Sequence, residues 1–481
     1  MELRKAAFIG EKPIDVKVNV KPVFAFLSHH GYTEGPCRTG TPEQLAPATE
    51  RKYAQQAYAD MMAQLTGLSP IAHVLDPVMI EHGDDWVIQE EEYSKLDKDA
   101  EAVDMFWITG MSLNQFVAVK VGERYKKPVA MFGSEFDPAL PMGIDAASHL
   151  RSKGLEAYVS IGMEEFNELL TLLQVRKALR QTRVLRVTEG KFDNVNGNLL
   201  DLSPFKQRLG IDVVDIPIEA FVVERDAIYR GLEGRQIADE TAAALVKNAQ
   251  GVHIDTEYVA NDILFYLTAK TLMEKHRCNA FTINCFEICP DERLAAERKN
   301  VPCLTHSLLK DQGLASACEG DIGALSAIML LQSLAKKTVY MGNLYLVNRQ
   351  EQLIMILHDV PGLKLKGYDA PDVPYDLRNF TIGGWGTTVR YDFSQDKGQE
   401  VTIARVSPSA DKIIITKGEI VDCGGFDTPS CTLRAVIRVK DAVDFFHKAA
   451  DFGNHSAMVY GDYRHQIRAL AEMIPLEVVE A

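Results

Sequence analysis

The chain has 481 residues and a formal net charge of −15, from 52 Lys and Arg against 67 Asp and Glu. This length suits about three domains of ~150 residues each. A charged fraction of 25% is typical of globular proteins and excludes general disorder. Because phosphates repel so acidic a chain, we expect neither nucleic acid nor an anionic membrane surface as a partner.

The sequence carries no sign of secretion or of membrane insertion. Its first residues lack an apolar core of signal-peptide length, and no apolar run reaches the ~18 residues of a membrane-spanning helix. The eight cysteines, without a secretion signal, are typical of reduced thiols. We therefore expect a cytoplasmic protein.

The first part of the chain alternates short strand patterns with longer helical ones. The predicted strands are residues 23–27, 103–108, 128–132, 157–161 and 184–187. The predicted helices are residues 50–65, 111–125 and 163–179. Strands that alternate with helices of this length form βαβ units, so we predict a parallel sheet covered on both faces.

A second alternating block runs from residue 182 to residue 340. Its predicted elements are the strands 212–216 and 280–283, a helical region at 253–275 and a helix at 319–335. Glu319 and Asp321 fall in the first turn of the last helix, where acidic side chains suit the helix dipole. Gly320 and Gly323 would allow a backbone or a ligand to approach closely.

After residue 340, strand patterns follow one another with Gly and Pro between them, which is typical of an antiparallel sheet or barrel. They are residues 353–357, 387–391, 401–405, 412–416 and 432–439, followed by helix 440–451, strand 457–460, helix 462–473 and strand 475–479. The predicted fold class is α/β. Two parallel-sheet α/β domains, 1–181 and 182–340, precede a β-rich, barrel-like antiparallel domain at 341–481.

Common motifs for nucleotide binding and nucleophilic catalysis are absent. We find no G-x-G-x-x-G, no P-loop and no Gly-x-Ser-x-Gly pattern. Cysteines 285, 289, 303 and 318, with His306 among them, suggest zinc, but their spacing lacks the close pairs of a structural zinc site. We expect these cysteines to be small thiols that line one region of the second domain.

Polar side chains at predicted strand ends are the best candidates for chemistry. Asn343 ends an apolar strand, His358 ends another, and His455 comes just before a C-terminal strand. Together with Glu319 they offer a carboxylate, an amide and imidazoles. This donor set forms an open site for a hard divalent ion such as Mn²⁺ or Mg²⁺.

The order of the motifs resembles the L-fucose isomerase and L-arabinose isomerase superfamily. The resemblance covers residues 280–362 and 380–479, and its most specific part is Cys-Glu-Gly-Asp. Over residues 1–270 it is architectural only. The matching pieces are Asn284-Cys-Phe286, Pro302-Cys303, Ser307, Leu308 and Asp311 before Gly313, Ala317-Cys-Glu-Gly-Asp321, Met341-Gly-Asn343, Ile354 to His358, and Gly453-Asn-His-Ser-Ala-Met-Val-Tyr-Gly-Asp462.

The resemblance implies a metal-dependent enzyme that interconverts an aldose and a ketose through a cis-enediol. Mn²⁺ is the implied cofactor, or another divalent ion such as Mg²⁺ or Co²⁺. Glu319 would bind the metal and move a proton, and His455 would be a further metal ligand. The site would lie between the second and C-terminal domains.

Asn343 departs from the family pattern, because an acidic metal ligand and second acid/base partner stands there in the family. Asparagine offers an amide oxygen to a metal but cannot take a proton. Either another acid (Glu287, Asp321 or Asp359) takes that role, or the chemistry has shifted. The alternatives are a related metal-assisted sugar epimerase or carbon–carbon cleaving enzyme, and a sugar-binding homologue without catalysis.

Four further residues are candidates for contact with a sugar substrate. His358 lies where arabinose-type members place another histidine ligand, and Trp385 offers a face for stacking. His30 and Arg38 belong to a polar loop after the first strand, which either contacts hydroxyls or an anionic group or is a solvated connection. The resemblance further implies a homo-oligomer, a trimer or hexamer, with the site near a subunit interface.

Overall fold

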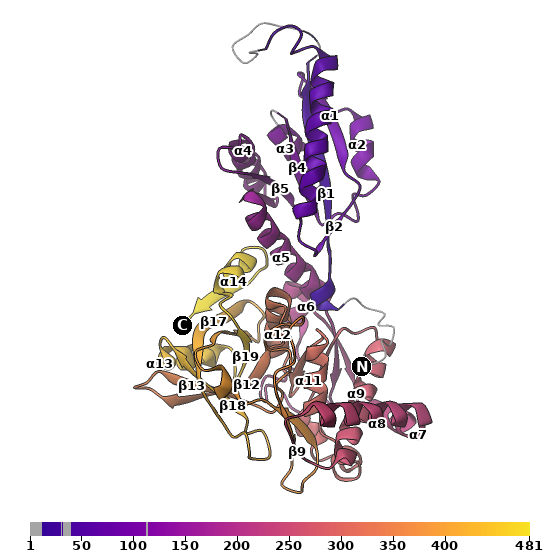
Figure 1. Cartoon of the computed structure of the whole chain (residues 1–481), viewed down its shortest axis with the longest axis vertical. Coiled ribbons are helices and arrows are strands. Elements are labelled where there is room, and N and C mark those ends of the chain that lie inside the picture. Colours follow the sequence, from indigo (N-terminus) through magenta and orange to yellow (C-terminus); the bar gives the residue numbers. More distant parts are fainter. Residues whose placement is uncertain (1–11, 30, 32–39, 112–113) are drawn as a thin grey trace. The chain divides into compact units, whose positions relative to one another are not determined.

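The computed structural model describes residues 12–29, 31, 40–111 and 114–481. The chain divides into two compact units (Figure 1). The N-terminal unit is Lys17–Gln174, and the C-terminal unit is Val175–Ala481 with the segment that ends at Val16. Each unit has a buried hydrophobic core of its own. The domain boundaries expected after residues 181 and 340 stay predictions.

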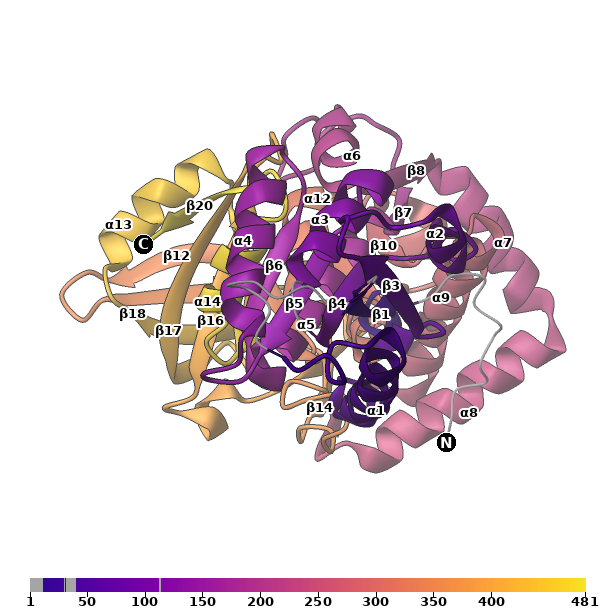
Figure 2. The ribbon, with the colours of Figure 1, turned by 90° about the horizontal axis from the view of Figure 1, so that it is seen from above.

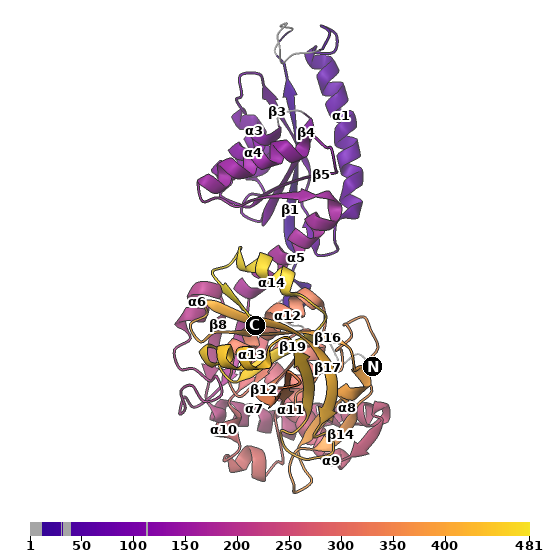
Figure 3. The ribbon, with the colours of Figure 1, turned by 90° about the vertical axis from the view of Figure 1, so that its left-hand side faces the viewer.

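The N-terminal unit is built on a parallel sheet with the strand order β2-β1-β4-β5-β6, in which β3 also pairs with β1. Its strands are β1 (Val18–Ser28), β2 (Ala72–Val74), β3 (Val78–Gly83), β4 (Met105–Met111), β5 (Val129–Gly133) and β6 (Ala157–Ile161). Its helices are α1 (Pro47–Gln64), α2 (Glu90–Asp97), α3 (Asn114–Tyr125) and α4 (Ala139–Ser152), followed by α5 (Gly162–Arg180), which continues into the C-terminal unit. Helix α1 lies on one side of the strands, and α3 and α4 lie on the other (Figure 3). The predicted two-sided parallel sheet is confirmed.

The C-terminal unit begins with a second parallel sheet, in the order β11-β10-β7-β8. Its strands are β7 (Arg183–Val187), β8 (Asp212–Ile216), β10 (Ala280–Ile283) and β11 (Ala315–Cys318). Helices α7, α8 and α9 lie together beside it (Figure 2). The helices of this part are α6 (Ser203–Leu209), α7 (Ile218–Arg230), α8 (Leu232–Asn248), α9 (Thr256–Lys275), α10 (Cys285–Ile288), α11 (Cys303–Asp311) and α12 (Ile322–Ala335). Strands β10 and β11 are buried along their whole length, as in parallel sheets covered on both faces.

The β-rich part forms a closed ring, because β16 pairs both with β19 and with β17. The ring runs β16-β19-β12-β13-β18-β17 with antiparallel neighbours, and β20 adds to β17 in parallel. Its strands are β12 (Tyr340–Asn348), β13 (Leu353–Leu357), β16 (Glu400–Val406), β17 (Lys412–Gly424), β18 (Arg434–Val439), β19 (His455–Tyr460) and β20 (Glu477–Glu480), with helices α13 (Ala442–Lys448) and α14 (Arg464–Ala471). The predicted barrel-like antiparallel arrangement of this part is therefore confirmed.

A small sheet stands apart from the ring, in the order β15-β14-β9. It joins β9 (Gly251–His253) to β14 (Asp376–Asn379) and β15 (Thr387–Arg390). The connection between β14 and β15 carries Trp385. Helix α12 contacts β11 of the parallel sheet and also β16 and β19 of the ring, so it joins the two sheets.

The start of α12 corrects one prediction. The helix begins at Ile322, so Glu319 does not lie in its first turn. Asp321 is the N-cap, and its side chain accepts a hydrogen bond from the backbone N–H of Ala324 at 2.8 Å. Glu319 and Gly320 have φ angles of +62° and +75°, which a right-handed helix does not contain. Among the described residues, no helix is long and apolar enough to cross a membrane.

Candidate functional site

Four elements of the C-terminal unit bring polar side chains to one place. Glu319 follows directly after β11, and His358 follows directly after β13. His455 is the first residue of β19, and Asn343 lies on β12. Asn343 and His455 are direct partners in the antiparallel ladder, so their side chains share one face of the ring.

Glu319 lies between the two histidines. Its Oε1 is 3.2 Å from Nε2 of His358, and its Oε2 is 3.4 Å from Nε2 of His455. The exposed fractions are 8% for Glu319, 1% for His358 and 0% for His455. Oε2 of Glu319 and Nε2 of His455 are buried, and neither makes a hydrogen bond with the described residues. Two buried polar atoms that face each other at ion-pair distance but make no hydrogen bond with the described residues are the most unusual feature of this site.

The carboxylates and imidazoles of the cluster each stabilise the charged form of their neighbours. Burial disfavours the ionised form of Glu319, but the hydrogen bond and charges of His358 and His455 outweigh it and hold the pKa of the carboxyl well below its usual range. Burial likewise opposes the charged form of His455, but Asp321 and Glu319 raise its pKa to about 9. For His358, burial is outweighed by Cys431 and Glu319, which raise its pKa to about 9. The site thus favours charged groups in a buried position.

Asp321 holds His455 in place from behind. Its Oδ2 is 2.9 Å from Nδ1 of His455 and 2.7 Å from Nη1 of Arg405. Arg405 lies on β16 and also donates to the backbone oxygens of Phe452 and His455, at 2.6 and 2.9 Å. Because Nδ1 faces a carboxylate, Nε2 of His455 is the ring nitrogen that faces Glu319.

The backbone around Glu319 leaves no room for larger neighbours. A Cβ on Gly320 would lie 2.5 Å from Oδ1 of Asn198, and one on Gly323 would lie 2.8 Å from the carbonyl oxygen of Val406. The predicted close approach of a backbone is therefore confirmed at Gly323, whereas at Gly320 the close neighbour is a side chain. Glu319 itself has a positive φ without being glycine, and strain of this kind is concentrated at functional sites.

A cavity of about 200 Å³ opens onto this cluster. Glu319 and His358 line one part of it, and Trp385 lines another. Nζ of Lys299 lies 5.1 Å from the ring centre of Trp385. Five cysteines also line the cavity: Cys285, Cys289, Cys303, Cys318 and Cys431. The sulfur atoms of Cys285 and Cys318 are 3.0 Å apart.

The other residues predicted for the site differ in whether they lie at the cavity. Trp385 is at the cavity, whereas His30 and Arg38 lie outside the described residues. Glu287 accepts hydrogen bonds from the 188–191 loop, through Thr188 and the backbone N–H groups of residues 189 and 191. Asp359 forms a buried ion pair with Arg390. Among the three acids named as substitutes for the acid missing at Asn343, Asp321 is the one whose carboxylate is shown in contact with the described residues of the cluster. Asp359 contacts it through its backbone N–H, which donates to Nδ1 of His358 at 3.2 Å.

The sequence reasoning missed Arg405 and Cys431. Arg405 was part of a predicted strand, but its charge inside an otherwise apolar run was a usable signal for a buried acidic partner. Cys431 carries no such signal, because it precedes β18 by a short loop and reaches His358 only through the folded ring, with Sγ 3.9 Å from Nδ1.

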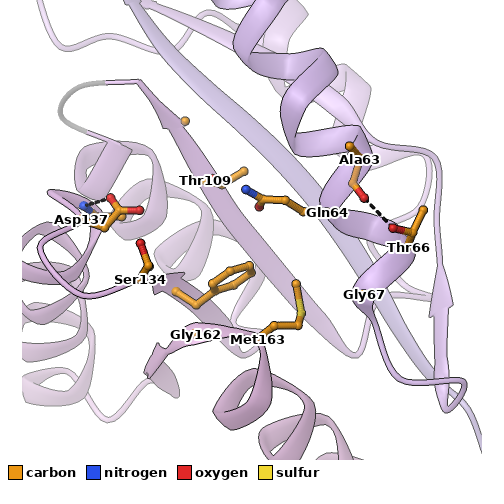
Figure 4. A pocket seen from close by; sticks show the side chains of 13 residues that line it. Ala63, Gln64, Thr66, Gly67, Thr109, Ser134, Asp137, Gly162 and Met163 are labelled. Carbon is orange, nitrogen blue, oxygen red and sulfur yellow. Dashed lines mark hydrogen bonds between the residues drawn. The ribbon is translucent and has the colours of Figure 1, made fainter.

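A second cavity, of about 460 Å³, lies in the N-terminal unit where β4 and β5 end. Asp137 and Ser134 lie on one side of it, and Gln64 and Thr66 lie on the other (Figure 4). Oδ1 of Asp137 accepts a hydrogen bond from the backbone N–H of Ala139 at 2.8 Å. Its described lining residues include no histidine, cysteine or cationic side chain, so the candidate chemistry belongs to the first cavity.

The buried carboxylate, the two imidazoles and the adjoining cavity define a centre of the kind that binds a cation or moves protons. No protein-family model matches the chain. Sulfoquinovose isomerase from Priestia aryabhattai is 25% identical over 242 residues, which are 48% of this chain and 50% of that protein. The protein of the same name from Alkalicoccus urumqiensis is 26% identical over 221 residues, 45% and 47% of the two chains. The chain thus spans about half the length of the curated relatives it matches.

Proposed function

We propose that this protein is an aldose–ketose isomerase that acts on a sulfonated hexose of the sulfoquinovose type. The observation that carries the proposal is Glu319, which is buried between His358 and His455 and lines a cavity of sugar-compatible size. The named activity of the relatives supports the reaction and the substrate class. The resemblance of the ordered motifs to sugar isomerases supports the same reaction independently of those names.

The residues present fit a divalent cation. Oε2 of Glu319 and Nε2 of His455 are buried, face each other at 3.4 Å and make no hydrogen bond with the described residues. We propose that Glu319, His455 and the amide oxygen of Asn343 hold Mn²⁺, or another divalent ion such as Mg²⁺ or Co²⁺. When bound, the ion supplies stabilisation of the negative charge that develops on the two oxygens of the enediol.

Isomerisation needs one group to move a proton between C1 and C2 and another to move a hydroxyl proton. We assign the carbon-bound proton to the carboxylate of Glu319. His358 lines the same cavity and is 3.2 Å from Glu319, so it is our candidate for the hydroxyl proton. Asp321 keeps Nε2 of His455 turned toward Glu319, and Trp385 offers its ring to a sugar face. We keep His30 and Arg38 as candidates for the sulfonate.

The test is isotope exchange by the full-length protein. Protein stripped of metal and resupplied with Mn²⁺ should incorporate one deuterium at C1 or C2 of sulfoquinovose in D₂O and form the ketose, as read by NMR and mass spectrometry. Pentoses and 6-deoxyhexoses are the comparison substrates, and they should react more slowly. If no deuterium is exchanged with any of these sugars, isomerisation is refuted. If the product is an epimer or a pair of cleavage fragments, the enzyme is instead an epimerase or a carbon–carbon cleaving enzyme.

Asn343→Asp tests the proposed metal ligands. The change adds one negative charge beside His455, so we expect the affinity for Mn²⁺ to rise at least tenfold, as measured by the electron paramagnetic resonance of free Mn²⁺. Asn348→Asp, on the same strand, is the matched control and should leave the affinity unchanged. Equal affinity in all three proteins would remove Asn343 from the ligand set. A large gain of turnover in Asn343→Asp would show that the natural site has lost catalytic activity.

The assembly is a further part of the proposal. We propose a homo-oligomer, a trimer or hexamer, with the cavity near a subunit interface. Ile382 supports this, because it is 91% exposed in the same β14–β15 connection that carries Trp385. Sedimentation velocity of the full-length protein measures the state, and a monomer at micromolar concentration would contradict it.

A further inference from the structure

Two of the cavity cysteines approach each other because of the parallel sheet. Cys318 ends β11, and Cys285 follows β10 by two residues, where Asn284 caps the short helix α10. In the ladder Ile283 is the partner of Cys318, so the two chain segments leave the sheet side by side. The sulfur atoms are 3.0 Å apart because of this pairing of strands. The two cysteines are far apart in the sequence, so their spacing does not reveal the contact.

This thiol pair, Cys285 and Cys318, lies next to two other donors. The sulfur of Cys318, a carboxylate oxygen of Glu319 and a ring nitrogen of His358 all lie within 4.8 Å of one another. With Cys285 they give two sulfurs, one nitrogen and one oxygen, and all four residues line the same cavity. Cys318, Glu319 and His358 are buried, so an ion bound here would be largely shielded from water.

We propose that Cys285, Cys318, Glu319 and His358 form a second metal site, selective for soft, thiophilic ions of the Zn²⁺ class. Zn²⁺ favours four tetrahedral ligands drawn from Cys, His and carboxylate, whereas Mn²⁺ and Mg²⁺ favour oxygen-rich sets. Each thiol that binds the ion loses its proton to solvent, so full ligation releases two protons from the pair. Tetrahedral ligation with ~2.3 Å bonds places two sulfurs ~3.8 Å apart. The pair therefore has to separate by less than ~1 Å, a small side-chain adjustment.

One consequence rests on the proposed function. Glu319 belongs to both donor sets, and the thiophilic ion would occupy His358 as well. The two ions therefore compete, and we expect Zn²⁺ to abolish Mn²⁺-supported isomerisation. The site itself does not depend on that activity, because its donors come from geometry alone.

The test uses direct binding of metals to the full-length, metal-free, reduced protein. Cd²⁺ should bind with one ion per chain and produce thiolate-to-metal charge-transfer absorption in the ultraviolet. Cys285→Ser and Cys318→Ser should each weaken binding at least tenfold and reduce the absorption. Cys289→Ser, in the same cavity, and Cys423→Ser, on β17, are the matched controls and should leave both unchanged.

X-ray absorption of the Zn²⁺-loaded natural protein keeps the test independent of how the variants fold. Two sulfur neighbours and two nitrogen or oxygen neighbours around zinc support the site. Nitrogen and oxygen neighbours alone overturn it, as does charge-transfer absorption that survives in both Cys285→Ser and Cys318→Ser. None of these measurements needs turnover, so a failure of the proposed isomerase activity would leave them interpretable.

Discussion

At the scale of single residues, Asp321 contacts both the site and the helix that follows it. Its carboxylate caps α12, pairs with Arg405 and holds His455, and both charged partners are almost fully buried. Burial disfavours the charged form, but Arg405 and His455 outweigh it and lower the pKa of Asp321 below its ordinary value. Removing one member of such a pair leaves the other charge buried and unpaired. The free-energy cost of that unpaired charge is larger than the net stabilisation that the pair provides.

Asp321→Asn isolates this charge, because asparagine is an equally good N-cap. We expect the free energy of unfolding to fall by about 3–5 kcal/mol, since the guanidinium of Arg405 loses its buried partner. Urea unfolding followed by circular dichroism measures the change. The control is Asp444→Asn, which removes an exposed pair with Lys448 and should cost less than about 1 kcal/mol. Equal effects of the two substitutions would show that the Asp321 pair is not stabilising.

At the scale of elements, the turn between β11 and α12 places the central carboxylate. Cys318 ends the strand, Glu319 and Gly320 both take positive φ angles, and Asp321 begins the helix. This turn directs Glu319 between His358 and His455 instead of along the helix. The conformation is costly for any residue with a Cβ, so the fold accepts strain at the position that the proposed reaction needs.

Glu319→Gly and Glu319→Ala compare the strain directly, because both remove the carboxylate and only alanine keeps the Cβ. We expect the glycine variant to be more stable than the alanine variant by about 1 kcal/mol. Thermal and urea unfolding measure the difference, and neither protein should catalyse isotope exchange. If alanine were the more stable of the two, the turn would have to relax away from the positive φ at little cost.

Elements with a local pattern were predictable, and contacts between distant elements were not. The strands at 157–161, 212–216, 280–283 and 353–357 have the predicted bounds. Each is a short segment rich in apolar residues, although the segment 212–216 also contains two aspartates. The helix at Glu319 was misplaced, since an acidic pair before an apolar run equally suits a first turn or an N-cap. The pairing of β16 with β17 and β19, and the meeting of Cys285 with Cys318, depend on tertiary contacts that no local pattern encodes.

At the scale of the whole molecule, each of the two units has a core of its own among the described residues. One core is made of residues between Val23 and Ala157 in the N-terminal unit, and the other lies in the C-terminal unit. The N-terminal unit is a single continuous segment with a complete parallel sheet. A segment with its own core and sheet is expected to fold alone.

We therefore expect residues 17–174, expressed separately, to unfold cooperatively with the circular dichroism of an α/β protein. In the full chain, calorimetry should show two transitions, one of which coincides with that of the fragment. Mn²⁺ should raise only the other transition, because Glu319, His455 and Asn343 all lie in the C-terminal unit. A fragment that remains unfolded, or a Mn²⁺ shift in both transitions, would show that the units depend on each other.

The position of Trp385 gives the molecule an internal optical reporter. The chain has three tryptophans, and Trp86 and Trp107 both belong to the N-terminal unit. Trp385 is thus the one indole of the C-terminal unit, and it lines the cavity beneath the ammonium group of Lys299. A protein with phenylalanine at positions 86 and 107 would emit from the cavity alone. Its emission wavelength and quenching would report whether the proposed sugar and metal ligands bind at the cavity, without a label and without turnover.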